Sequence, residues 1–278
     1  MIILAHDGSI YGDWVARYAI GFAAVEADRK LLVLHVAEGK VSQEIVDSRL
    51  ARLGKDCAVL GIEFLSQVLP LGKSTYRSLR QSVPHDPQAL LICGTRLKPR
   101  GQNYLSGSVA EQLLRMHQCP VLALRVVQPG LLGHPHDLLL PLAGHLGGFS
   151  RSWPVFSRLC PFLHTVYLFR SLYVNQLRHP YLSSARKQAL KEIGIKYLIK
   201  ISSEMEEQLG PLSFRVDHRV AISADWVNDV LVLASRLKVQ IMLLGVSERN
   251  LAHRVLHGAA MEKVLRNTSC DVGIYRGP

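Results

Sequence analysis

Two glycines on either side of a variable loop could bind a phosphate group. Apolar residues 90–93 end at Gly94, which predicts a buried strand that stops abruptly. Gly107 and Ser108 then begin a segment with the apolar spacing of a helix. The first turn of a helix has unpaired N–H groups and a positive dipole end, so it can hold phosphate. Because glycine has no Cβ, the backbone at Gly94 and Gly107 can approach a ligand closely.

Other chemistry is poorly represented in the sequence. It contains no nucleophile–base arrangement, no hydrolase nucleophile elbow and no cysteine pair with metal-ligand spacing. His253 and His257 are four residues apart and would share one face of a helix, but no third ligand accompanies them. We therefore expect neither catalytic residues nor a metal site.

The loop-and-helix segment occurs twice, with an offset of 151 residues. Gly94 corresponds to Gly245, and residues 107–125 align without a gap with residues 258–276. Glu111 and Glu262 occupy the same place in both copies, which a charge on a helix surface explains. A repeat of this length indicates two copies of one domain rather than a solenoid unit of about 20–50 residues. We expect a first domain over residues 1–128, a linker over 129–136 and a second domain over 137–278.

Length and charge are consistent with this division. The 278 residues allow two domains of roughly 140 residues, each able to bury a core. The net charge is +11, from 15 Lys/Arg against 11 Asp/Glu in residues 1–130 (+4) and 18 against 11 in residues 131–278 (+7). This balance favours anionic partners, whether nucleotide, nucleic acid or an acidic membrane surface. The charges are dispersed, however, so we favour a solvated basic surface.

The sequence also bears on the compartment. An odd count of five cysteines indicates reduced thiols, as in the cytosol. The N-terminus lacks the basic region of a signal peptide, and no apolar run is long enough to span a membrane. We expect a cytoplasmic protein without membrane attachment. Nucleic-acid binding has only the charge in its favour, because no aromatic–basic interleaving accompanies it.

Strands alternate with helices along both copies. Expected strands in the first copy are 2–5, 31–36, 62–69, 89–93 and 121–126, and in the second 138–142, 165–169, 214–220, 241–244 and 272–275. Such alternation predicts two tandem doubly wound α/β domains, each with a five-stranded, mostly parallel sheet and helices on both faces. Ser183 is expected to cap a long helix whose inward residues are Leu190, Ile193, Tyr197, Ile201 and Met205.

This order of elements resembles the universal stress protein family. A strand precedes Asp7-Gly8-Ser9, the next strand ends at His35-Val36, and the glycine-flanked loop leads to a helix. The resemblance covers both copies, hence nearly the whole chain, and implies the family's Rossmann-like, adenine-nucleotide alpha-hydrolase-like fold. The family signature G-x2-G-x9-G-[ST] keeps its spacing in copy one, where Leu97 replaces the second glycine. In copy two, Glu248 and Ala259 replace two of the four signature residues.

The resemblance also implies a nucleotide site in the first domain. In ATP-binding relatives the aspartate after the first strand meets the ribose, and the valine ending the second meets adenine through its backbone. The matching candidates are Asp7, Val36, Gly94, Gly107, Ser108 and Val109. Asp7 and Ser108 could instead only cap the helices that follow them. Ala143 stands where the carboxylate would be in copy two, so we expect that copy to be empty.

We therefore expect a tandem universal stress protein, a stress-response regulatory module without catalysis, with one candidate site for ATP or another adenine nucleotide in domain 1. One alternative is a protein-interaction module that binds no nucleotide but contacts regulatory protein partners. A further alternative is a slow ATPase.

The last strand of each copy is expected to lie at the edge of its sheet. These strands are Val121–Arg125 and Val272–Arg276, and both are apolar. An unpaired apolar edge promotes aggregation, and a partner strand removes that risk. Because the linker raises the effective concentration of each copy near the other, we expect the two to pair within one chain as a pseudo-dimer.

Overall fold

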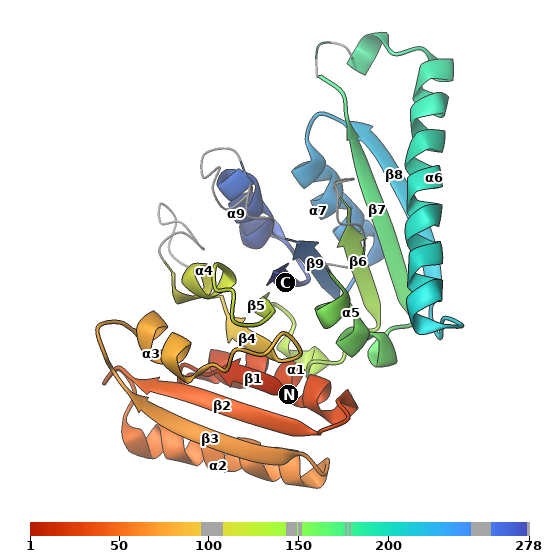
Figure 1. Cartoon of the computed structure of the whole chain (residues 1–278). Helices are drawn as coiled ribbons and strands as arrows, with labels where there is room; N and C mark the ends of the chain where they lie inside the picture. Colours follow the sequence, from red (N-terminus) through yellow and green to blue (C-terminus); the bar gives the residue numbers. More distant parts are fainter. Residues whose placement is uncertain are drawn as a thin grey trace.

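Ten strands form one continuous sheet in the computed structural model (Figure 1). The structure describes residues 1–95, 108–142, 149, 152–175, 177, 179–245 and 257–276. The strand order is β3-β2-β1-β4-β5-β10-β9-β6-β7-β8. Within each half of this order all pairings are parallel, and the two halves meet at β5 and β10. The predicted α/β class, with two five-stranded doubly wound units, is confirmed.

The first half contains the five strands β1 to β5. Its elements are β1 (Ile2–Ala5), α1 (Ile10–Val25), β2 (Lys30–Ala37), α2 (Gln43–Val59), β3 (Glu63–Pro70), α3 (Thr75–Ser82), β4 (Leu90–Gly94), α4 (Val109–Leu114) and β5 (Val121–Arg125). A short 3-10 helix, η1 (Pro129–Leu131), follows in the linker.

The second half repeats this order with longer elements at the outer edge of the sheet. Its elements are β6 (Asp137–Pro141), α5 (Trp153–Leu159), η3 (Cys160–Phe162), β7 (Thr165–Tyr173), η4 (His179–Tyr181), α6 (Ser184–Leu209), β8 (Arg215–Ser223), α7 (Trp226–Leu237), β9 (Ile241–Gly245), α9 (His257–Asn267) and β10 (Asp271–Arg276). Helix α6 has 26 residues against 17 in its counterpart α2.

Helices cover both faces of the sheet and bury two cores. Alternate strand residues point to opposite faces, so Ile2 and Leu4 join one core while Ile3 joins the other. The first core is closed by α1, α2, α5 and α6, and the second by α3, α4, α7 and α9. The central strands are buried on both faces, as their nearly continuous apolar sequences require.

The two halves join through their last strands. Strand β10 pairs antiparallel with β5, with Val272 opposite Arg125 and Arg276 opposite Val121. Gly273 allows close packing here, because an added Cβ would lie 2.6 Å from the Leu243 side chain. Neither strand therefore remains an edge, and the outer edges of the ten-stranded sheet are β3 and β8.

The buried face of α6 is confirmed in its second half and differs from the predicted one at Ile193. Ser183 caps the helix as expected, accepting a hydrogen bond from the Arg186 N–H. Ile201 and Met205 are buried as predicted, and Tyr197 is partly buried against the core. Ile193, however, is 56% exposed, and Gly194 and Leu198 are buried beside it. Gly194 explains the difference: an added Cβ would stand 2.7 Å from Cγ1 of Val220 in β8, so the helix rests on the sheet at this glycine.

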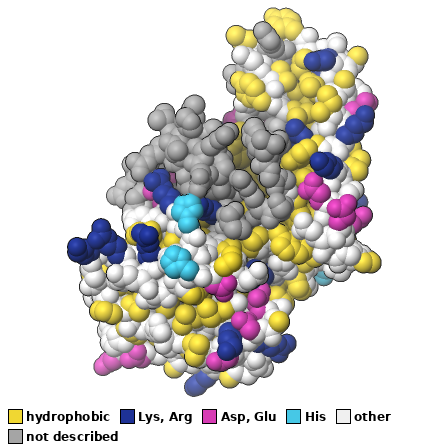
Figure 2. Space-filling model, viewed as in Figure 1, with side chains coloured by type: hydrophobic (Ala, Val, Ile, Leu, Met, Phe, Trp, Pro, Cys, Tyr) yellow, Lys and Arg dark blue, Asp and Glu magenta, His cyan; other side chains and the backbone are white. Residues whose placement is uncertain are grey.

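Charged side chains are spread over the surface. Lys and Arg side chains occupy several separate places on the face shown in Figure 2 rather than one block. Among the described residues, no helix has both the length and the hydropathy needed to cross a lipid bilayer.

Candidate functional site

The first half brings three of the predicted site residues to one edge of its sheet. Asp7 follows β1, Val36 lies near the end of β2, and Gly94 ends β4. Strand β1 has β2 and β3 on one side and β4 and β5 on the other. The strand order therefore switches direction at β1, which makes it the topological switch point of the sheet. In open α/β sheets the crevice at the carboxyl ends of such strands is where ligands bind. Ser108 and Val109 begin the nearby crossover helix α4, whereas Gly107 lies outside the described residues.

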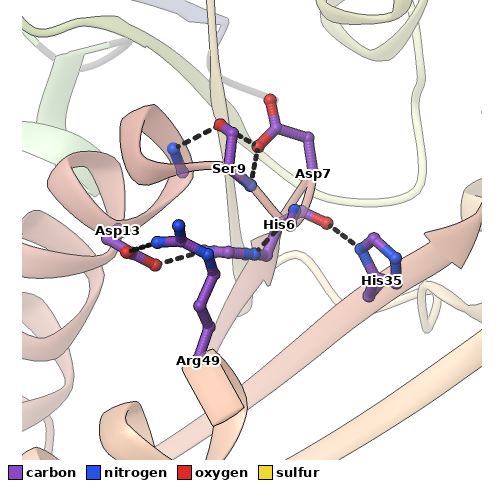
Figure 3. Close-up of polar contacts among 8 residues, drawn as sticks. His6, Asp7, Ser9, Asp13, His35 and Arg49 are labelled. Atoms are coloured by element: carbon purple, nitrogen blue, oxygen red, sulfur yellow. Dashed lines mark hydrogen bonds and ion pairs between the residues drawn. The ribbon is translucent and has the colours of Figure 1, made fainter. Parts of the chain in front are cut away.

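Asp7 is held in place by the residue that caps α1. Its Oδ1 accepts hydrogen bonds from the backbone N–H of Ser9 at 3.0 Å and from the Ser9 hydroxyl at 2.5 Å (Figure 3). Ser9 Oγ in turn accepts from the N–H of Gly12 at 3.1 Å, so Ser9 is the N-cap of α1. The alternative that Asp7 itself caps the helix is therefore wrong. Asp7 is an exposed carboxylate that the cap orients.

The buried side chain of His6 forms hydrogen bonds that stabilise the turn carrying Asp7. His6 Nδ1 accepts the Gly8 N–H at 3.0 Å, so neutral His6 carries its proton on Nε2, which donates to Asp13 Oδ1 at 3.1 Å. Asp13 also forms an ion pair with Arg49 of α2. Burial raises the pKa of Asp13, but contacts with His6 and Arg49 outweigh it and leave that pKa below its ordinary value.

A second histidine and two glycines complete the support of the turn. His35 Nδ1 donates to the carbonyl of His6 at 2.9 Å, linking β2 to the end of β1 (Figure 3). Gly8 adopts a φ of +77°, which favours glycine. At Gly12 a Cβ would stand 2.8 Å from both Asp7 Oδ1 and His6 Nε2. Sequence reasoning missed these contacts, and the polar His6 directly after an apolar strand was the one available signal.

Val36 lies where an adenine contact was predicted, with its carbonyl already engaged. It accepts a hydrogen bond from the Glu38 N–H at 2.9 Å. The Glu38 side chain contacts Lys40 and the Thr75 hydroxyl, and these two groups lower the pKa of its carboxyl. The turn after β2 is thus closed by its own hydrogen bonds, so adenine would have to share or replace one of them.

The glycine at position 94 is explained by packing against Tyr11, which the sequence did not reveal. An added Cβ would lie 3.1 Å from Cε1 of Tyr11 in α1. The Tyr11 hydroxyl donates to the carbonyl of Thr95 at 2.8 Å and accepts the N–H of Val126 at 2.9 Å. The glycine therefore admits a tyrosine that ties the end of β4 to the end of β5. In the second half, a Cβ added at Gly245 would similarly lie 2.8 Å from the hydroxyl oxygen of Tyr275.

Ser108 caps α4, as one of the sequence alternatives proposed. Its Oγ accepts the N–H of Glu111 at 3.1 Å, and Val109 is the first helical residue. Glu111 pairs with Arg115 at 2.7 Å, and Glu262 pairs with Arg266 at 3.0 Å on α9. The Glu111 side chain is only 12% exposed and that of Glu262 only 16%, so both are largely buried rather than the surface charges that the sequence indicated.

An open groove runs alongside the same turn. It is lined by Ser9, Ile10, Tyr11, Trp14, Arg125, Val126 and Val127. The groove shares Ser9 with the Asp7 turn but extends along α1 towards the linker.

Little of the matching region in the second half is described. Ala143, Glu248 and His253 lie outside the described residues, as do Leu97 and the rest of the variable loop. Gly258 lies within α9, which begins at His257. In the part of the chain that the structure describes, no three His, Cys, Asp or Glu side chains gather as a metal site would require.

Fold and site together define an α/β protein with paired Rossmann-like units and a switch of strand order at β1, where Asp7 lies. No protein-family model and no curated protein sequence matches the chain. Solved structures do match over nearly its whole length. A universal stress protein from Archaeoglobus fulgidus DSM 4304 has a TM-score of 0.61 at 16% identity, covering 99% of this chain and 96% of that one.

Two further structures show the same architecture. A putative universal stress protein from Pseudomonas aeruginosa UCBPP-PA14 has a TM-score of 0.60 at 15% identity, covering 98% of this chain and 91% of that one. The cytoplasmic domain of a prokaryotic cation chloride cotransporter has a TM-score of 0.55 at 9% identity, covering 99% and 94%. The chain therefore has the fold of universal stress proteins, with two units in tandem.

Proposed function

We propose that the chain is a tandem universal stress protein that binds one adenine nucleotide in its first half and acts as a non-catalytic regulatory module. The candidate contacts are Asp7, Val36, Gly94, Gly107, Ser108 and Val109. The observation that carries the proposal is the position of Asp7, an exposed carboxylate at the switch point between β1 and β4. A carboxylate there can accept hydrogen bonds from the two ribose hydroxyls.

The surrounding turn favours such a role. Ser9 fixes the Asp7 carboxylate, and the His6–Asp13–Arg49 contacts fix the turn that carries both residues. A binding group held before the ligand arrives loses less conformational entropy on binding. Ser9 rather than Asp7 caps α1, so the helix does not require the Asp7 carboxylate as its N-cap.

Calorimetric titration with ATP, ADP and AMP tests the proposal. The intact chain should release heat with at least one of the three nucleotides, and Asp7→Ala combined with Gly107→Val should abolish it. Glu44→Gln, an exposed change on α2, is the matched control and should bind as the wild type does. Heat that survives in the Asp7/Gly107 variant would refute the site, and no heat with any nucleotide would refute nucleotide binding.

Two contacts favour a second candidate, a protein-interaction module that binds no nucleotide. The space beside Gly94 holds the Tyr11 ring, and the Val36 carbonyl accepts the Glu38 N–H. Both features would persist without a ligand. Denaturing the purified protein and analysing the supernatant for nucleotides separates the candidates. Released adenine nucleotide in an amount comparable to the protein would count against this second function.

A further inference from the structure

The second half carries an arm that the first half lacks. The arm consists of β7, β8 and the long helix α6, and Figure 1 shows it projecting beyond the rest of the sheet. Helix α6 spans about 39 Å, whereas α2, its counterpart, spans about 26 Å. The described residues between β7 and α6, namely 174, 175, 177 and 179–183, lie at the tip of the arm.

The tip exposes three large side chains close together in the sequence. Tyr173 is 75% exposed, Leu177 80% and Tyr181 88%. Two hydrogen bonds form among the described residues here: the Val174 N–H donates to the carbonyl of Ser223, and the Leu177 N–H donates to the Asn175 side chain at 2.9 Å. Single exposed apolar residues are common on proteins, but three on one projecting turn indicate a contact surface.

Cations follow these side chains in the sequence, at the start of α6. Arg186 and Lys187 occupy the first turn of α6, and Lys191 follows one turn later. That first turn contains no acidic residue, although cations at the positive end of a helix dipole cost stability. None of the three cations forms an ion pair with a described residue, and Glu192 is the one acid in the first half of the helix.

We propose that the tip of the arm docks on an anionic lipid surface, with Tyr173, Leu177 and Tyr181 entering the headgroup region and Arg186, Lys187 and Lys191 contacting acidic headgroups. Apolar and aromatic residues beside Lys and Arg are the composition of peripheral membrane-binding segments. Figure 2 shows apolar side chains at the end of the arm with Lys and Arg next to them.

The shape of the tip favours a membrane over a protein partner. A stable protein interface buries about 800 Å² on each partner around a packed centre. Three side chains on a projecting turn cannot supply that area, but a bilayer requires only their partial insertion. Each cation near an anionic bilayer adds about fivefold to the partition coefficient. The sequence alone predicted no membrane attachment, because the tip becomes evident only when β7, β8 and α6 are seen to project together.

Sedimentation of the intact chain with phospholipid vesicles tests the proposal. The protein should bind vesicles that contain phosphatidylglycerol, bind pure phosphatidylcholine vesicles weakly, and dissociate as the salt concentration rises. The triple change Tyr173→Ser, Leu177→Ser and Tyr181→Ser should weaken binding about tenfold. The triple change Arg186→Glu, Lys187→Glu and Lys191→Glu should weaken it by more than about a hundredfold, because it removes three attracted charges and adds three repelled ones.

Matched controls come from the opposite edge of the sheet. Ile45→Ser, Val59→Ser and Leu71→Ser remove three exposed apolar residues, and Arg52→Glu, Lys55→Glu and Lys73→Glu reverse three exposed cations. The apolar control should bind as the wild type does, and the charge control should lose less than the tip variant. Circular dichroism must show equal folding of every protein compared.

Three results would overturn the proposal. These are no sedimentation with anionic vesicles, wild-type binding by the tip variants, or equal loss in the tip and control variants. Retention by a single-stranded oligonucleotide without any binding to vesicles would identify a different partner and overturn it as well.

Discussion

The Tyr18 hydroxyl donates a 2.6 Å hydrogen bond to Oδ2 of Asp271, joining α1 of the first half to β10 of the second. Asp271 is fully buried, and its Oδ1 accepts the N–H groups of Val127 and Gln128, which directly precede the linker. Burial raises the pKa of Asp271, while these donors act in the opposite direction. One carboxylate thus connects both halves and the segment between them.

Replacing Tyr18 with phenylalanine should therefore destabilise the whole sheet. The change keeps the ring but leaves a buried carboxylate oxygen without this donor, which should cost about 1–3 kcal/mol of unfolding free energy. Urea denaturation checks this expectation. Tyr173→Phe, which removes an exposed hydroxyl from the same residue type, should stay within about 0.5 kcal/mol of the wild type. Equal stability of Tyr18→Phe and wild type would mean that the contact contributes nothing.

Ionisation of Asp13 should make the free energy of unfolding depend on pH in the acidic range. Its pKa is lowered in the folded protein, so its contribution is present above the ordinary value of 3.8 and is lost as the pH falls below it. Asp13→Asn should be less stable than the wild type at neutral pH. The difference in unfolding free energy between the two proteins should decrease below about pH 3.8. Thermal melting across this range measures the difference, with Glu44→Gln as the exposed control. A difference that stays constant down to the lowest pH would contradict the assignment.

Tyr11 and Gly94 should be energetically coupled. Gly94→Ala places a methyl group 3.1 Å from the Tyr11 ring and should cost about 1–3 kcal/mol. In a Tyr11→Ala background, which lacks the ring, Gly94→Ala should lower the unfolding free energy by less than it does in the wild type. A double-mutant cycle measures the coupling, expected at about 0.5–3 kcal/mol. Strictly additive effects would show that the glycine does not serve the tyrosine.

Neighbouring positions on α6 should respond in opposite ways. Gly→Ala usually stabilises a helix by about 1 kcal/mol, but at Gly194 the new methyl meets Val220 and should destabilise the arm. Ile193→Ala, one residue away on the exposed side, should change stability by less than about 0.5 kcal/mol. Val220→Ala should partly rescue Gly194→Ala. Stabilisation by Gly194→Ala would disprove the close approach.

The sequence predicted those features that depend on local pattern. The alternation of apolar strands and amphipathic helices was enough to assign the α/β class, and Ser183 and Ser108 could be recognised as caps because capping depends on a few adjacent residues. The end of β7 was placed too early, at Phe169, because Arg170 and Ser171 interrupt the apolar pattern. In the fold Arg170 stacks on Tyr197 at 4.0 Å and Ser171 donates to Asp229 at 2.8 Å, so the strand continues to Tyr173.

Contacts between distant residues leave no such pattern. Tyr18 and Asp271 are 253 residues apart, and nothing near either residue indicates the other. Likewise, Gly94 suggested a ligand because the sequence does not show that the space beside it belongs to Tyr11. Ile193 of α6 was wrongly placed on the inward face for a similar reason, since only the position of Val220 shows why Gly194 faces the sheet.

The central claim is a single adenine-nucleotide site in the first half, and the number of nucleotide molecules bound per chain tests it most directly. Equilibrium dialysis of the intact protein against labelled ATP, ADP and AMP in turn should saturate at one molecule per chain with at least one of them, and Asp7→Ala should remove that binding. Saturation at two molecules per chain, or no binding of any of the three, would contradict the account.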